Sequence, residues 1–159
     1  MCAGPGSPSE DHPQQWATAT RTDSAGAQET EALGARLAAL LHDGDVVLVR
    51  GEVGAGKTTF VRGAARALGV AEPVTSPSFS IGHRYAAGSS QVSHLDLYRL
   101  GDLAAEDPGL LLDYLGPGRI AFVEWPEQAE SGLPGVRFRV TLAHAGEDRR
   151  TVLVEERAG

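Results

Sequence analysis

One glycine-rich stretch, GEVGAGKTTF from Gly51 to Phe60, constrains the fold of this chain more than any other segment. Its two glycines, lysine and hydroxyl residue have the spacing of a phosphate-binding loop, whose backbone N–H groups hold phosphate oxygens at a helix N-terminus. Such a loop needs a strand before it and a helix after it. The apolar run at 45–49 and the segment at 57–68 supply both, so the stretch predicts a strand–loop–helix unit that binds a nucleotide.

The residue types within this loop predict separate roles. Gly54 and Gly56 allow the backbone amides to surround phosphate oxygens. Lys57 is expected to reach the outer phosphates, Thr58 to bind Mg²⁺ through its hydroxyl, and Thr59 to contact the α-phosphate. Lys57 is also the only lysine among 14 basic residues. A compact ammonium suits a point contact to phosphate oxygens better than a guanidinium fork does.

Two carboxylates are candidates to complete the site. Glu124 ends the apolar run 120–123, where phosphate-loop enzymes hold an acid for Mg²⁺ or its waters. The alternative is an ordinary strand-end charge that faces water. Asp96 shares one face of a predicted strand with His94 and Tyr98. From periodicity alone, that face fits a water-positioning or metal-positioning site and a solvent-exposed polar surface equally well.

The segment TSPSF carries three hydroxyls, Thr75, Ser76 and Ser78, around Pro77. By itself it is typical of a plain proline turn. Its position between the phosphate-loop helix and the next strand is where nucleotide hydrolases have switch loops, which favours a functional role.

Periodicity and turn residues predict the remaining elements. Residues 16–22 alternate weakly as a first strand, and Asp23 or Ser24 is expected to cap a helix that runs through Leu41. Further strands are predicted at 79–86, 91–100, 119–125, 136–144 and 149–157, with helical segments within 101–116.

These elements predict a single α/β domain at 16–159 behind a disordered tail at 1–15. Because strands alternate with helices and end in a hairpin, we expect a P-loop NTPase-like layered domain. It has a mixed central sheet, helices on both faces and a C-terminal β-hairpin.

Charge and cysteine content narrow the function classes. The net charge of −7 argues against a protein that holds nucleic acid unaided, because such binding depends on neutralising phosphates. The single cysteine, Cys2, cannot form a disulfide within the chain, which fits a reducing compartment. No secretion signal or membrane-spanning stretch is recognisable, so we expect a soluble, cytoplasmic protein with no membrane association.

Four stretches, GEVGAGKTTF, TSPSF, HLDLYRL and VEWPE, occur in this order and at intervals that resemble the bacterial TsaE family, also called YjeE. Members of this family are ATPases needed for making threonylcarbamoyladenosine in tRNA. The likeness runs from about Thr30 to Arg150. Many families share the phosphate loop, whereas HLDLYRL together with VEWPE is much more specific.

The resemblance implies roles for individual residues. It makes Lys57, Asp96 and Glu124 the catalytic residues, and it makes Thr58 and Glu124 the ligands of Mg²⁺. Ser78 stands where the family usually has threonine, which keeps the hydroxyl and loses the methyl group. The residues implied in ATP binding are Gly54, Ala55, Gly56, Lys57, Thr58, Thr59, Ser76, Ser78 and, from the last hairpin, Arg149.

The resemblance also implies partners. The protein would join the TsaD–TsaB pair, support its turnover by hydrolysing ATP, and leave transfer of the threonylcarbamoyl group and most contacts with tRNA to these partners. The main alternative is a small-molecule or nucleoside kinase, which typically needs an arginine-rich lid that is not evident between Gly101 and Gly118. A GTPase-like switch is less favoured because the chain has no asparagine for a guanine-binding motif.

Overall fold

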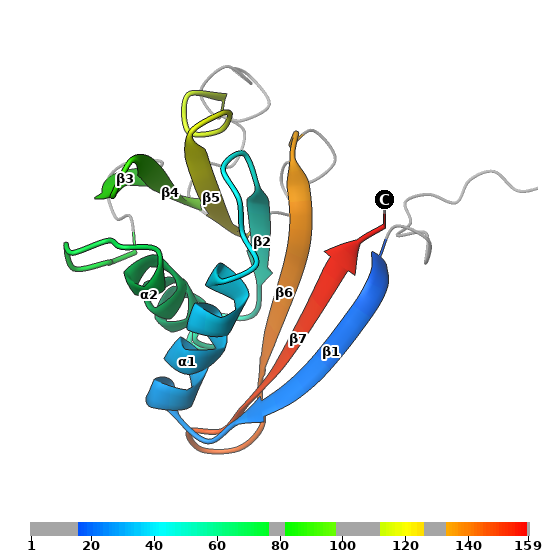
Figure 1. Cartoon of the computed structure of the whole chain (residues 1–159). Helices are drawn as coiled ribbons and strands as arrows, with labels where there is room; N and C mark the ends of the chain where they lie inside the picture. Colours follow the sequence, from blue (N-terminus) through cyan, green and yellow to red (C-terminus); the bar gives the residue numbers. More distant parts are fainter. Residues whose placement is uncertain (1–15, 77–81, 98–111, 126–132, 159) are drawn as a thin grey trace, which may run out of the picture.

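The predicted strands form one continuous sheet in the computed structural model, which describes residues 16–76, 82–97, 112–125 and 133–158 (Figure 1). The predicted tail at 1–15 lies outside the described residues. In chain order the elements are β1 (Trp16–Ser24), α1 (Ala27–Ala38), β2 (Val46–Arg50), α2 (Lys57–Ala67), β3 (Gly82–Ala87), β4 (Ser90–Asp96), β5 (Arg119–Glu124), β6 (Val136–His144) and β7 (Arg150–Arg157).

The sheet is mixed, with seven strands in the order β1-β7-β6-β2-β5-β4-β3. Strand β2 pairs in parallel with β5 and β6, and β5 pairs in parallel with β4. The hairpins β3–β4 and β6–β7 and the pair β1–β7 are antiparallel. The central strands β2 and β5 are buried along almost their whole length, which explains why their sequences are continuous apolar runs.

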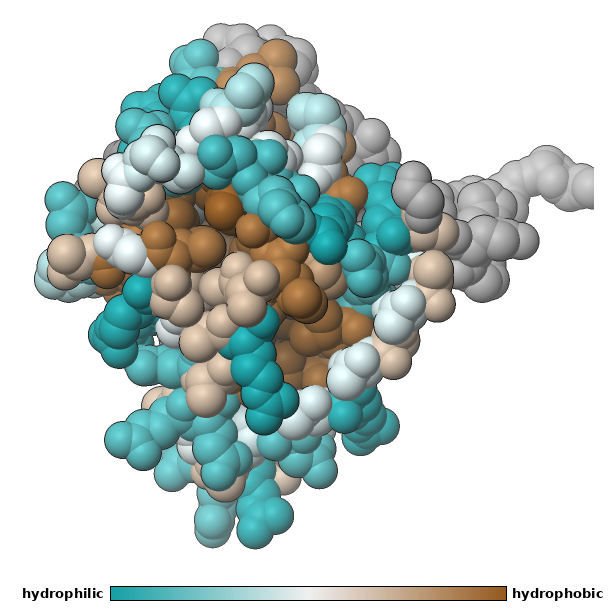
Figure 2. Space-filling model, in the orientation of Figure 1, coloured by the Kyte–Doolittle hydropathy of each residue, from teal (hydrophilic) through white to brown (hydrophobic). Residues whose placement is uncertain are grey.

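Both described helices lie on the same face of the sheet (Figure 1). One hydrophobic core fills the space between them and the strands and includes Leu37, Phe60 and Phe122. A second core lies on the opposite face and includes Leu48 and Val123. Figure 2 shows the molecule in the orientation of Figure 1. On the side that faces the viewer, apolar residues gather in the middle, with hydrophilic residues around them. The middle of the sheet is therefore buried on both of its faces.

The predicted α/β fold with a mixed sheet and a C-terminal hairpin is confirmed. The predicted helices on both faces are not found among the described residues, where α1 and α2 share one face. The segment 101–116, which the sequence predicts to be partly helical, lies largely outside the described residues. Within the described residues, no helix is long and apolar enough to cross a membrane.

The start of α1 differs from the prediction. Gly26 precedes the first helical residue in an extended conformation, and no side chain caps the helix. Ser24 instead packs its hydroxyl against that of Thr30, 2.7 Å away and buried, which ties the end of β1 to the first turn of α1. The prediction of Asp23 or Ser24 as the N-cap was therefore wrong. The helix also ends at Ala38, before the predicted Leu41.

Candidate nucleotide-binding site

The glycine-rich loop connects the end of β2 to the start of α2. Gly51 has a φ of 149°, and a Cβ atom there would lie 2.6 Å from the backbone oxygen of Leu142 on β6. Gly56 has a φ of 99° and immediately precedes α2. Side chains at these positions would clash or strain the backbone, so glycine is what allows the chain to turn tightly here. The helix N-terminus consequently opens onto the loop, as anion binding requires.

Lys57 is the first residue of α2, and its ammonium group is held inside the loop. Its Nζ donates hydrogen bonds to the backbone oxygens of Gly51 at 2.7 Å and Glu52 at 3.0 Å. It also lies 4.3 Å from the ring centroid of Trp125, within range of a cation–π interaction. The residue is only 5% exposed. The loop therefore holds a positive charge at its centre.

Thr58 and Glu124 meet although they are 66 residues apart in the chain. The Thr58 hydroxyl donates to Oε2 of Glu124 at 3.1 Å. Glu124 ends β5 beside β2 and is 3% exposed. This burial excludes the alternative of a strand-end charge facing water. A hydroxyl and a carboxylate lie side by side at the start of the loop helix, as the sequence pattern predicts.

The polar residues of β4 extend this cluster. Asp96 is the direct neighbour of Glu124 across the parallel strands, and Ser76 donates a long hydrogen bond of 3.4 Å to its Oδ2. His94 donates from Nε2 to Oε2 of Glu124 at 2.5 Å. Both β4 residues are buried, His94 completely. The alternative of a solvent-exposed polar face is therefore wrong for these two positions.

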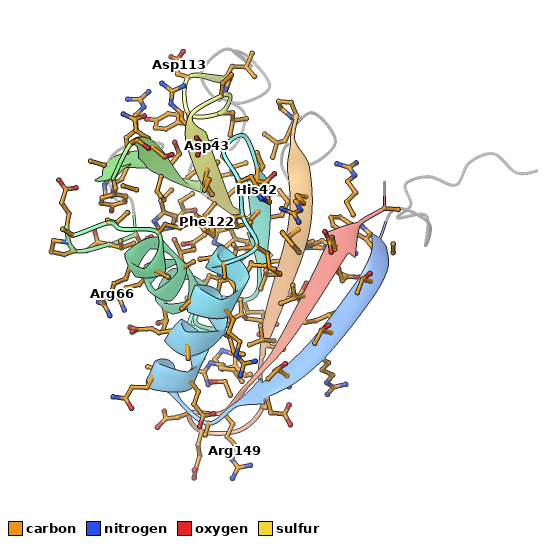
Figure 3. All side chains as sticks on the ribbon, viewed as in Figure 1. His42, Asp43, Arg66, Asp113, Phe122 and Arg149 are labelled. Carbon is orange, nitrogen blue, oxygen red and sulfur yellow. The ribbon has the colours of Figure 1, made fainter. Side chains whose placement is uncertain are left out.

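Of the predicted nucleotide-binding residues, one is not described and one lies away from this cluster. Ser78, like Tyr98 of the predicted β4 face, lies outside the described residues. Arg149 is exposed at the turn between β6 and β7, at the edge of the molecule in Figure 3. Its neighbour Arg150 instead donates from its guanidinium to the backbone oxygen of Gly54 at 3.1 Å. The role of Arg149 stays a prediction, while Arg150 is the arginine that contacts the loop.

The alternation along β7 is the signal that favours Arg150. Val152 is buried in the core on the helix side, and Val154 packs against it. Residues two apart in a strand share a face, so Arg150 belongs to the side that carries the helices and the loop. Trp125 had a weaker signal, because its place after Glu124 in the stretch VEWPE does not indicate a contact with Lys57.

A cavity of about 290 Å³ opens beside the loop, between the first turn of α1 and the β6–β7 turn. It lies next to Thr59, which is expected to contact the α-phosphate. The residues that line it are Gly26, Ala27, Thr30, Gly54, Gly56, Thr59, Asp148 and Arg150.

The oxygens of Thr58 and Glu124 fit the chemistry of Mg²⁺. The described residues contain no group of three or more His, Cys, Asp or Glu side chains that could hold a metal ion. Magnesium does not require one, because it is usually bound by one or two protein oxygens together with substrate phosphates and water. The adjacent hydroxyl and carboxylate therefore fit a magnesium ion that arrives with a nucleotide.

The site has the arrangement that is typical of the P-loop class. It combines a parallel strand, a glycine loop, a buried lysine at the helix start, a following hydroxyl and a buried acid on the neighbouring strand. Comparison with known proteins narrows this class. The family model described as threonylcarbamoyl adenosine biosynthesis protein TsaE matches residues 24–152. The chain belongs to the TsaE family, and the resemblance stated from the sequence is confirmed.

Relatives match over most of their length. The tRNA threonylcarbamoyladenosine biosynthesis protein TsaE of Bacillus subtilis is 39% identical over 125 residues, covering 79% of this chain and 78% of the relative. The protein of the same name from Treponema pallidum is 36% identical, covering 84% of this chain and 98% of the relative. The crystal structure of Bacillus subtilis YdiB superposes with a TM-score of 0.70 at 32% identity, covering 87% of this chain and 86% of that one.

Proposed function

We propose that the protein binds ATP with Mg²⁺ and hydrolyses it as an accessory to the formation of threonylcarbamoyladenosine at the adenosine next to the anticodon of tRNA. The observation that carries the ATPase assignment is the contact between the Thr58 hydroxyl and the buried Glu124 carboxylate beside the preorganised Lys57. The names of the relatives support the link to tRNA modification.

Each residue of the cluster has one task in this proposal. The backbone amides of 54–59 and the ammonium of Lys57 bind the phosphates, while Thr58 and Glu124 hold Mg²⁺. When bound, the ion neutralises charge on the outer phosphates. Asp96 lies beside Glu124 and bonds to Ser76, so it orients a water molecule or the TSPSF loop at the phosphate end of the site.

The nucleoside occupies the cavity beside Thr59. Thr59 faces the α-phosphate side, so the ribose and base extend away from the outer phosphates toward the first turn of α1 and the β6–β7 turn. The cavity lining includes a negative charge on Asp148, a positive charge on Arg150 and the hydroxyl of Thr30. These groups supply hydrogen bonds to a polar nucleoside.

Arg150→Ala is expected to weaken ATP binding about 5- to 10-fold, because the lost hydrogen bond to the loop contributes about 1 to 1.4 kcal/mol. Arg149→Ala is the matched control. It also removes one arginine charge, but from the adjacent position, where the side chain is exposed. Isothermal titration calorimetry on the two variants measures the difference. A larger loss from Arg149→Ala would return the nucleotide contact to that residue.

The partners in this proposal are TsaD and TsaB, which transfer the threonylcarbamoyl group. The net charge of −7 suits a protein that reaches tRNA through others, because it opposes direct binding to phosphates. The proposal includes a cytoplasmic location, where tRNA is modified.

Steady-state phosphate release tests the proposal. The protein alone is expected to hydrolyse ATP slowly, and the TsaD–TsaB pair is expected to raise the rate about tenfold or more, because P-loop enzymes lack full activity until charge and water are positioned around the γ-phosphate. Modification of tRNA by TsaD and TsaB is expected to stop when the protein or ATP is omitted. An isolated enzyme that is fast and indifferent to the pair, or one that phosphorylates a nucleoside or metabolite, would overturn the proposal.

A further inference from the structure

A single carboxylate oxygen joins three elements of the site. Oε2 of Glu124 on β5 accepts hydrogen bonds from the hydroxyl of Thr58 in the first turn of α2, at 3.1 Å, and from Nε2 of His94 on β4, at 2.5 Å. The described residues give the other oxygen of this carboxylate, Oε1, no hydrogen bond. One oxygen is therefore held from two sides, and the second is left for other ligands.

Because His94 and Glu124 are both buried, the hydrogen bond between them matters for the orientation of the carboxylate. His94 is completely buried and Glu124 is 3% exposed. A carboxylate withdrawn from water must be compensated by hydrogen bonds, and little solvent reaches this one. His94 thus supplies one of the two hydrogen bonds that keep Glu124 in its orientation at the end of β5.

A role in stability alone does not explain a histidine at this position. Its Nδ1 is buried and has no hydrogen-bond partner among the described residues. An unsatisfied buried polar atom costs about 1–3 kcal/mol, so leucine or phenylalanine would fill the same space at lower cost. The histidine is therefore present despite the cost of its unsatisfied Nδ1. Its Nε2 binds Glu124, which indicates that this hydrogen bond is the reason for a histidine at position 94.

We infer that His94 is a positioning residue for the magnesium carboxylate. It acts through Glu124, holding Oε2 so that the remaining oxygen meets the ion or its waters in one orientation. Residues that orient metal ligands in this way commonly change metal affinity 10- to 100-fold when they are removed. The inference rests on the proposed role of Glu124 in binding Mg²⁺ with ATP.

The test compares ATP binding with Mg²⁺ and with excess EDTA in His94 variants of the full chain. His94→Leu keeps the volume and removes the donor, so it is expected to raise the Kd for Mg–ATP about tenfold or more and to change the Kd in EDTA by less than about twofold. His94→Gln places an amide N–H near the position of Nε2 and is expected to restore most of the magnesium effect. His94→Asn places its amide nitrogen near Nδ1 instead and is expected not to.

Phe122→Leu is the matched control. Phe122 is the direct neighbour of His94 on β5 and is completely buried, and its side chain has no group that can hydrogen-bond to Glu124, so it reports the effect of disturbing the core without removing a donor. If His94→Leu does not fold, the difference between His94→Gln and His94→Asn decides the question. The apo protein provides an independent readout, because ¹⁵N NMR of the imidazole is expected to find the proton on Nε2.

Glu124→Gln separates the two possible failures. If this variant keeps the full magnesium effect on ATP binding, Glu124 is not the magnesium carboxylate and the proposed function of the site fails. If Glu124→Gln loses the effect while His94→Leu behaves like Phe122→Leu, the proposed function stands and the positioning role of His94 is overturned. A ring protonated on Nδ1 alone would also overturn it.

Discussion

Replacing Lys57 with alanine is expected to weaken ATP binding about 100-fold and to leave the fold intact. The ammonium is nearly buried and held by the backbone oxygens of Gly51 and Glu52, so it meets the phosphates without reorganising. Hydrogen bonds to charged groups contribute up to about 3 kcal/mol, and the chain has no second lysine to replace the lost charge. Calorimetry measures the affinity, and circular dichroism checks the fold.

Two further variants define what this result means. Lys57→Arg retains the charge but is expected to bind ATP poorly, because a guanidinium fork is too large for the space inside the loop. Arg36→Ala removes one positive charge from the exposed face of α1 and is expected to leave ATP binding unchanged. Wild-type affinity in Lys57→Ala would refute the phosphate-loop assignment, and an equal loss in Arg36→Ala would attribute the effect to net charge.

The phosphate loop could be predicted from the sequence because its geometry is local. The spacing from Gly51 to Thr58 fits one kind of turn, and the apolar run before it fits a buried parallel strand. The same holds for the C-terminal hairpin, where alternation and a turn determine both strands. Glu124 and Asp96 were also predictable as candidates, since carboxyl ends of parallel strands lie at one edge of a sheet.

The contacts between these residues could not be predicted, because they depend on register between distant strands. Periodicity alone left His94 and Asp96 equally suited to solvent and to a site, and only the pairing of β4 with β5 places them beside Glu124. The contact of Lys57 with Trp125 joins segments far apart in the chain and has no local signature. The contact of Arg150 with Gly54 could not be predicted either, because the sequence does not show which face of β7 lies toward the helices.

The crossing of the two helices was equally hidden in the sequence. Gly34 on α1 and Gly63 on α2 have ordinary helical surroundings in the sequence, where glycine only lowers helix propensity. In the structure, a Cβ atom on Gly34 would lie 2.2 Å from the backbone oxygen of Phe60. One on Gly63 would lie 2.0 Å from the backbone oxygen of Glu31. The glycines therefore allow the two helix backbones to approach each other closely.

Gly63→Ala is expected to destabilise the protein by about 3 kcal/mol, although alanine is the better helix former. Propensity alone would stabilise α2 by about 1 kcal/mol. The new methyl group, however, meets the backbone of Glu31, which cannot rotate away as a side chain can, so the helices must separate or bend at the cost typical of an overpacked core. For a chain of this length, that loss lowers the melting temperature by about 6–12 °C.

Because α2 begins with Lys57 and Thr58, moving it also disturbs the contact with Glu124, and ATP affinity is expected to fall with stability. Thermal unfolding and calorimetry measure the two effects. Ala67→Gly, at the exposed end of α2, calibrates the propensity contribution without touching α1. A Gly63→Ala protein that melts higher than wild type would mean that propensity outweighs packing and that the helices do not approach as closely as the structure places them.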